Sequence, residues 1–286
     1  MTFLMRKITR TIASHIRKRL GGTIEKKSSS IEKFPPGSQV HHLKPGEPVF
    51  PFLNSRAQLE PTLQYLTSSM DWSWGCFREV LICLARMGGG NYIPAIRRPD
   101  CVHLDGLQTT FTELRHLSAQ RQGRETSRII LVDRHRACLV ISGKTHIGSL
   151  DKVKIGTAKE IGREFAQIPI LSIHVHPGIG DNPGLSDQDY ISFLSDRHLI
   201  IMMVCFQGGN LFAMKTSATP ASFAPDTSRA RINVIRNDIH RIWSNMSLPK
   251  PILAFNKAVC MEFGLTLYQT EDQQQNVARR IEVTEA

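Results

Sequence analysis

Two histidines, a serine and an aspartate lie within SIHVHPGIGDNPGLSDQDY, residues 172–190. His174 and His176 are one residue apart in an apolar run typical of a strand, so their side chains share one face, about 6.5–7 Å apart along it. Pro177 keeps His176 extended, and the glycines that follow let the chain turn back. Two imidazoles on one strand face can therefore converge on one metal ion.

The serine and the aspartate begin the helix that we expect at 186–196. Ser186 is a suitable N-cap, and Asp189 falls in the first turn, where exposed N–H groups and the helix dipole favour a carboxylate. An ordinary helix start has the same pattern, and a His-x-His pair also occurs without metal. If the helix start folds back over the strand end, however, Asp189 supplies a third ligand. Two His and one carboxylate with an open fourth position form a catalytic zinc shell, which predicts one zinc ion per chain.

Hydrophobic periodicity predicts the elements that must position these residues. From about residue 125 the predicted elements are strands in SRIILVD, ACLVISG and HIGSL, a helix at 156–167, a buried strand at 169–175, the helix at 186–196, a hairpin formed by LIIMMVCF and LFAMKTS, and helices around 235–245 and 252–262. Together they predict an α/β fold, a mixed β-sheet flanked by helices.

The sequence divides into five predicted segments. They are a basic amphipathic helix at 1–25, a linker at 26–50, a mainly helical N-terminal region at 51–120, the domain that carries the motif at 121–230, and a C-terminal helical extension and tail at 231–286. The linker is rich in Ser, Pro, Gly and charged residues.

The net charge of +11 is concentrated at the N-terminus. Residues 1–35 hold nine Lys or Arg against two Glu, so seven of the eleven net positive charges lie there. Ile8, Ile12, Ile16 and Leu20 form an apolar stripe among these cations. The segment fits a surface helix or flexible leader, a contact to an anionic membrane or nucleic acid, or a targeting presequence.

Composition favours a soluble protein of the cytoplasm. Hydrophobic residues make up 41% of the chain, enough to fill a core, and the longest apolar run, at 199–206, is too short to span a membrane. The six cysteines are scattered without a Cys-x-x-Cys pair, which favours reduced thiols.

The sequence His174-Val-His176-Pro, a loop and Ser186-x-x-Asp189, followed by a helix and a hairpin, resembles the signature of the JAMM/MPN zinc metalloprotease family over about residues 120–217. The resemblance implies a JAB/MPN domain with a cytidine-deaminase-like fold. It implies a peptidase that cleaves peptide or isopeptide bonds, often at the C-terminus of ubiquitin or its relatives. Zinc would then be held by His174, His176 and Asp189, while Ser186 would help to bind the tetrahedral oxyanion.

The same resemblance requires an upstream glutamate as general base. We expect Glu125 in this role, because it immediately precedes SRIILV and lies 49 residues before the first motif histidine, a spacing that fits the family. Glu113, Glu160 and Glu164 fall inside expected helices and are expected to be solvated. Members of the family tend to have a glycine three residues after the glutamate, where this chain has Arg128.

Two other functions fit the sequence. Cys76 follows a glycine at the start of a helical pattern, where a thiolate would be stabilised as in papain-like hydrolases, although no partner histidine has a recognisable motif and free Cys is usually buried. A chain without a complete metal site would instead be a catalytically inactive scaffold or binding module.

Overall fold

A mixed β-sheet forms the centre of this α/β protein. The computed structural model describes residues 39–41, 56–133, 137–142, 145–148, 167–176, 184–243, 249–271 and 276–283, all in one compact unit that begins at Pro35. The strands are β1 (Gln39–His41), β2 (Asp71–Trp72), β3 (Cys101–His103), β4 (Thr126–Asp133), β5 (Cys138–Ile141), β6 (His146–Ile147), β7 (Gln167–Val175), β8 (Ile201–Phe206), β9 (Gly209–Lys215), β10 (Leu265–Thr270) and β11 (Val277–Ile281).

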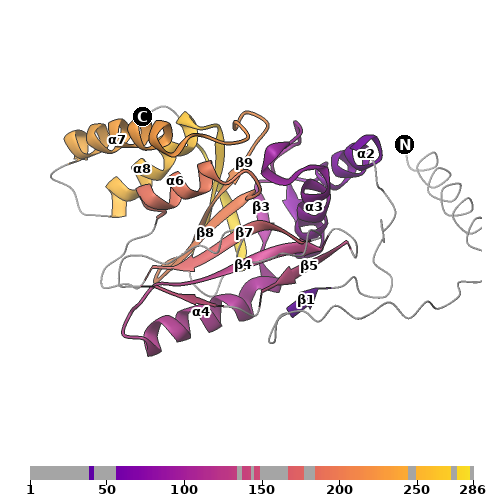
Figure 1. Cartoon of the computed structure of the whole chain (residues 1–286), viewed down its shortest axis with the longest axis horizontal. Coiled ribbons are helices and arrows are strands. Elements are labelled where there is room, and N and C mark those ends of the chain that lie inside the picture. The colour runs from indigo at the N-terminus through magenta and orange to yellow at the C-terminus, as the bar shows by residue number, and fades with distance from the viewer. Residues whose placement is uncertain are drawn as a thin grey trace, which may run out of the picture. The chain divides into compact units, whose positions relative to one another are not determined.

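Ten of the described strands follow one another across the sheet in the order β1-β5-β4-β7-β8-β9-β10-β11-β3-β2. Figure 1 shows β5, β4, β7 and β8 side by side in its centre. The short strand β6 pairs with the start of β4, beside this path. β7 and β8 run parallel near the middle of the sheet, and β2 and β3 run parallel at one edge. The other neighbouring strands are antiparallel.

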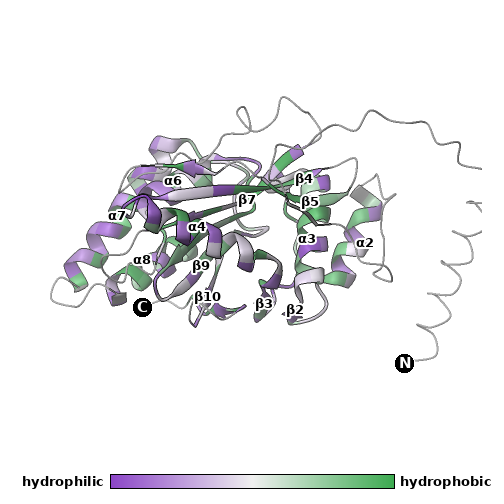
Figure 2. Ribbon diagram, turned by 90° about the horizontal axis from the view of Figure 1, so that it is seen from below, coloured by the Kyte–Doolittle hydropathy of each residue, from purple (hydrophilic) through white to green (hydrophobic). Residues whose placement is uncertain are grey.

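Helices cover both faces of the sheet. They are α2 (Arg56–Leu66), α3 (Trp74–Met87), α4 (Gln108–Gln120), α6 (Asp187–Ser195), α7 (Pro225–Trp243) and α8 (Pro249–Glu262), with single 3-10 turns at Gly89–Asn91 and Asp105–Leu107. Buried residues of α2, α3 and α4 join one hydrophobic cluster with the strands, and those of α6, α7 and α8 join a second. In Figure 2 green is concentrated in α3 and in the strands at the centre of the molecule, whereas α7 shows much purple.

The central strand β7 sends alternate side chains to the two faces. Ile173 and Val175 pack in the cluster that includes α3 and α4. Because side chains alternate along a strand, His174 and His176 lie on the opposite face, which α6 covers. The sheet therefore presents both imidazoles to one helix.

The structure confirms the elements expected around the motif. β4, β5 and β6 occupy the three apolar runs after residue 125, and β7 occupies the expected buried strand. β8 and β9 form the expected hairpin, α6 begins after Ser186, and Glu113 lies in a helix, α4, as expected. No helix in the described part of the chain has the length and hydropathy needed to cross a membrane.

The sheet crosses the segment boundaries that the sequence suggested. β2 and β3 come from 51–120, which was expected to be mainly helical, and β10 and β11 come from 231–286, which was expected to be a helical extension. β1 lies inside the predicted linker and pairs with β5. These strands pair with partners that are distant in sequence, so local periodicity does not reveal them.

Two predicted helices lie outside the described residues. They are the basic helix at 1–25 and nearly all of the helix at 156–167. The last residue of the second, Gln167, is described and begins β7.

Substitution of Tyr268 can show whether β10 contributes to the hydrophobic core around the sheet. It is fully buried, its ring stacks on Phe212 with centroids 4.8 Å apart, and its hydroxyl donates to Pro99 O at 3.1 Å. Tyr268→Ala should lower the free energy of unfolding by about 3–5 kcal/mol in urea denaturation, because it removes a large buried ring. Tyr65→Ala, at a 67% exposed position, should change it by less than about 0.5 kcal/mol. Equal effects of the two variants would contradict a core role for β10.

Candidate metal centre

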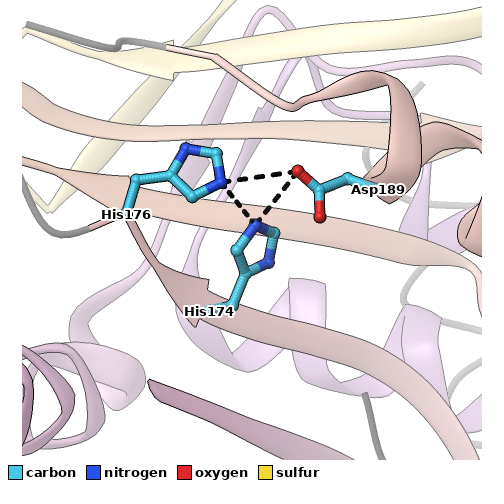
Figure 3. Close-up of side chains that lie close together, drawn as sticks. All are labelled: His174, His176 and Asp189. Carbon is cyan, nitrogen blue, oxygen red and sulfur yellow. Dashed lines mark hydrogen bonds and ion pairs between the residues drawn. The ribbon is translucent and has the colours of Figure 1, made fainter. Parts of the chain in front are cut away.

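The end of β7 and the first turn of α6 bring His174, His176 and Asp189 together (Figure 3). The Nε2 atoms of the two histidines are 3.2 Å apart. Asp189 Oδ2 lies 3.3 Å from His174 Nε2 and 3.4 Å from His176 Nε2. The three potential ligand atoms thus form a nearly equilateral triangle.

The size of this triangle fits a small divalent cation. Zinc bonds imidazole nitrogen and carboxylate oxygen at about 2.0–2.2 Å, so two ligands at a tetrahedral angle are separated by about 3.3–3.6 Å. The three separations, 3.2, 3.3 and 3.4 Å, lie at or just below the lower end of that range. His174 is fully buried and His176 nearly so, which shields the donors from competing water. The residues present can therefore hold a metal ion without rearrangement.

The histidine rings are oriented for binding through Nε2. Each Nε2 faces the triangle, while the Nδ1 atoms of both rings are buried and have no hydrogen-bond partner among the described residues. A neutral imidazole that binds a metal through Nε2 carries its proton on Nδ1. Nε2 is therefore the ring nitrogen that each histidine would offer to a metal ion.

The capping box of α6 fixes the Asp189 carboxylate. Ser186 N and Ser186 Oγ both donate to Asp189 Oδ2 at 2.7 Å, and Asp189 N donates back to Ser186 Oγ at 3.3 Å. Burial alone would raise the pKa of Asp189, but the charges and hydrogen bonds of His174 and His176 outweigh it and hold the pKa well below its usual value. Asp189 is therefore ionised, as a metal ligand must be.

Glu125 stands beside the triangle. It precedes β4, whose Thr126 is the register partner of Val175, so the antiparallel pairing carries Glu125 toward His176. Glu125 Oε1 is 3.9 Å from His176 Nε2, and its side chain is only 11% exposed. The carboxylate is not one of the three mutually close donors, so it borders the site without belonging to the ligand group.

The other residues considered from the sequence lie elsewhere. Arg128 points to the opposite face of β4, where it donates to Glu113 Oε2 at 2.6 Å and to Thr145 Oγ1. Glu113 thus pairs with Arg128 and not with the histidines. Glu160 and Glu164 lie outside the described residues.

Cys76 is not placed as an activated nucleophile. It lies in the first turn of α3, but its thiol donates to Leu66 O at 3.2 Å. Burial, reinforced by the charge of Glu79, raises the pKa of the Cys76 thiol to about 11. The desolvation of the thiolate outweighs any benefit from the helix start, which argues against the thiol hydrolase considered from the sequence.

One residue beside the site was not expected from the sequence. Asn256, on α8, hydrogen-bonds to Leu185 and Tyr190, which flank the turn that carries Ser186 and Asp189. Its partners lie 66 to 71 residues earlier, and no local pattern marks it.

No protein-family model, curated protein or solved structure matches this chain significantly. The chemistry of the site therefore follows from its own side chains. On that basis this is an α/β protein with a candidate three-ligand metal centre at the end of a central strand of its sheet.

The metal centre can be tested by its zinc content. His174→Ala and Asp189→Ala should each lower zinc affinity by more than the ~10–100-fold typical of residues that only support a ligand. Asp187→Ala is the matched control, because this neighbouring acid pairs with Arg236 instead. Mass spectrometry of metal content after dialysis should find about one zinc in the wild type and in the control. Zinc retained by Asp189→Ala would rule out this site.

The Cys76 thiol should react slowly. With a pKa of about 11, less than about 0.1% of it is ionised at pH 7.5, so iodoacetamide should modify Cys76 at least tenfold more slowly than it modifies glutathione. Peptide mass spectrometry over time measures this rate. Rapid modification of Cys76 with parallel loss of hydrolysis would restore the thiol mechanism.

Proposed function

We propose that this chain is a zinc-dependent metallopeptidase of the JAMM/MPN type, which hydrolyses a peptide or isopeptide bond. The observation that carries the proposal is the triangle of His174, His176 and Asp189 with a buried carboxylate, Glu125, at its border. Two imidazoles and one carboxylate are the ligand set of a catalytic zinc site with an open position.

The order of these residues along the fold supports the same proposal. The glutamate precedes one strand, the histidine pair ends the neighbouring strand, and the aspartate lies in the first turn of the following helix. This is the arrangement that the resemblance to the JAMM/MPN signature implies for a JAB/MPN domain. The proposed substrate class, a peptide or the C-terminal tail of a ubiquitin-like protein, rests on that resemblance.

The ligand residues and the neighbouring acid would have separate roles. A zinc ion held by His174, His176 and Asp189 would supply Lewis acidity, which lowers the pKa of a bound water to about 7. Glu125 would accept the proton of the attacking water at Oε1 and donate it to the leaving amine. Its low exposure, 11% for the side chain, keeps bulk water from competing for that proton.

Ser186 would contribute a hydrogen bond to the substrate. The residue is exposed, and its hydroxyl sits at the start of α6, where it now donates to Asp189 Oδ2. A hydroxyl can rotate to donate to the oxyanion that forms when water attacks the carbonyl, an interaction typically worth about 2.7–4 kcal/mol. Asp189 would keep its bond from Ser186 N in that state.

Glu125→Gln separates metal binding from turnover. The amide keeps the size of the side chain but cannot accept the proton, so hydrolysis should fall by about 10²–10⁴-fold while zinc content stays unchanged. Glu113→Gln is the matched control, because that carboxylate pairs with Arg128 on the other face of β4.

Cleavage would be measured on ubiquitin-like conjugates and on short peptide amides, each with and without a zinc chelator. Chelation should abolish cleavage by the wild type. Full activity of Glu125→Gln would show that the base is misassigned, and cleavage that persists without zinc would overturn the proposed reaction.

A further inference from the structure

Asn256 is a fully buried amide whose hydrogen-bonding groups are all used. Its Oδ1 accepts from Leu185 N at 3.0 Å and from the Tyr190 hydroxyl at 2.8 Å. Its Nδ2 donates to Leu185 O at 3.3 Å and to Ile252 O, within its own helix, at 2.9 Å. A buried amide is costly unless it is paired in this way, so the side chain has one favourable orientation here.

The two ends of this network bracket the Asp189 turn. Leu185 immediately precedes the N-cap Ser186, and Tyr190 immediately follows Asp189. One oxygen atom of Asn256 thus binds the chain on both sides of the segment that contains the carboxylate ligand. The Tyr190 ring is fully buried and packs edge-on against Phe255, the neighbour of Asn256.

Gly184 makes room for the amide. A Cβ at this position would lie 2.3 Å from Asn256 Nδ2 and 2.6 Å from Ile252 Cγ2. The backbone before Ser186 therefore lies directly against α8, at a distance that only glycine allows. Gly184 and Leu185, which immediately precede the capping box, thus both lie against the Asn256 side chain of α8.

The histidines are positioned by different neighbours. His174 and its strand are held by register pairing with β4 and β8, whereas the start of α6 is held by α8. The separation of Asp189 Oδ2 from both Nε2 atoms consequently depends on where α8 places the turn. Groups that orient metal ligands commonly change metal affinity by about 10–100-fold when they are removed.

We propose that Asn256 is a positioning residue of the metal centre. Its hydrogen bonds to Leu185 and Tyr190 set the position of Asp189 relative to the two histidines. This inference rests on the metal site of the proposed function. It makes α8 part of the metal centre, although α8 supplies no ligand to the group formed by the described residues.

Cobalt(II) binding tests the proposal without any substrate. Asn256→Ala in the full chain should weaken Co²⁺ binding at least about tenfold and change the visible d–d spectrum, because a displaced carboxylate alters the coordination. Gly184→Ala disturbs the contact between residue 184 and the Asn256 side chain and should have the same effect. It keeps the test available if Asn256→Ala folds poorly. Tyr190→Phe removes only the hydrogen bond from the Tyr190 hydroxyl to Asn256 and should give a smaller loss of Co²⁺ affinity.

Val259→Ala is the control for a merely structural effect. Val259 is fully buried on α8 but cannot hydrogen-bond through its side chain to the turn. Its replacement should lower the thermal unfolding temperature while Co²⁺ affinity and spectrum stay as in the wild type. Thermal unfolding of each metal-free variant, followed by circular dichroism, provides the comparison.

The outcomes distinguish this inference from the proposed function. Wild-type affinity and spectrum in Asn256→Ala and Gly184→Ala would overturn the positioning role, and so would an equal loss of affinity in Val259→Ala. A wild-type chain that binds no Co²⁺ would overturn the metal centre itself. A chain that binds Co²⁺ as expected but hydrolyses nothing would overturn the proposed reaction and leave the role of Asn256 intact.

Discussion

One carboxylate oxygen, Asp189 Oδ2, is shared by a helix cap and a pair of imidazoles. It accepts two bonds of 2.7 Å from Ser186 and lies 3.3 and 3.4 Å from the two histidine nitrogens. A carboxylate oxygen has about two lone-pair sites, so four neighbours exceed its capacity. A cation bound between the three donor atoms would coordinate both imidazole nitrogens and the carboxylate oxygen. The imidazoles would then no longer compete for the lone pairs of that oxygen. That oxygen would then have three neighbours instead of four, and rotation of the Ser186 hydroxyl toward a substrate would leave it two, the cation and Ser186 N.

The rest of the fold can be understood as the support for this oxygen and its neighbours. β7 is fixed on both sides, by β4 and by β8, so its alternation places both rings on the side of α6. The same pairing with β4 determines where Glu125 emerges. The opposite face of β4 carries Arg128 and its partners, which keeps a buried positive charge away from the histidines.

The chemistry of the site was visible in the sequence because its signals are local. A strand alternates its side chains, and Ser186 and Asp189 form a capping box within four residues, so the triangle could be predicted from spacing. The contribution of Asn256 could not, because its partners are set by packing of α8 against α6. The polar strand β11, with VARRI, and the three-residue strand β3 also lack a periodic signal, and they are strands because they pair with each other. For the same reason the sheet includes strands from several of the predicted segments.

The pairing of β3 with β11 has a consequence for how the chain folds. Val102, one strand in from the edge of the sheet, is the register partner of Ala278, so β3 can complete its pairing only when a segment far later in the sequence is available. Closing so long a loop is entropically costly, and folds rich in such pairings form slowly. Until β11 has paired with β3, that side of the sheet is incomplete, and the apolar residues of α3 that pack over β3 remain partly uncovered.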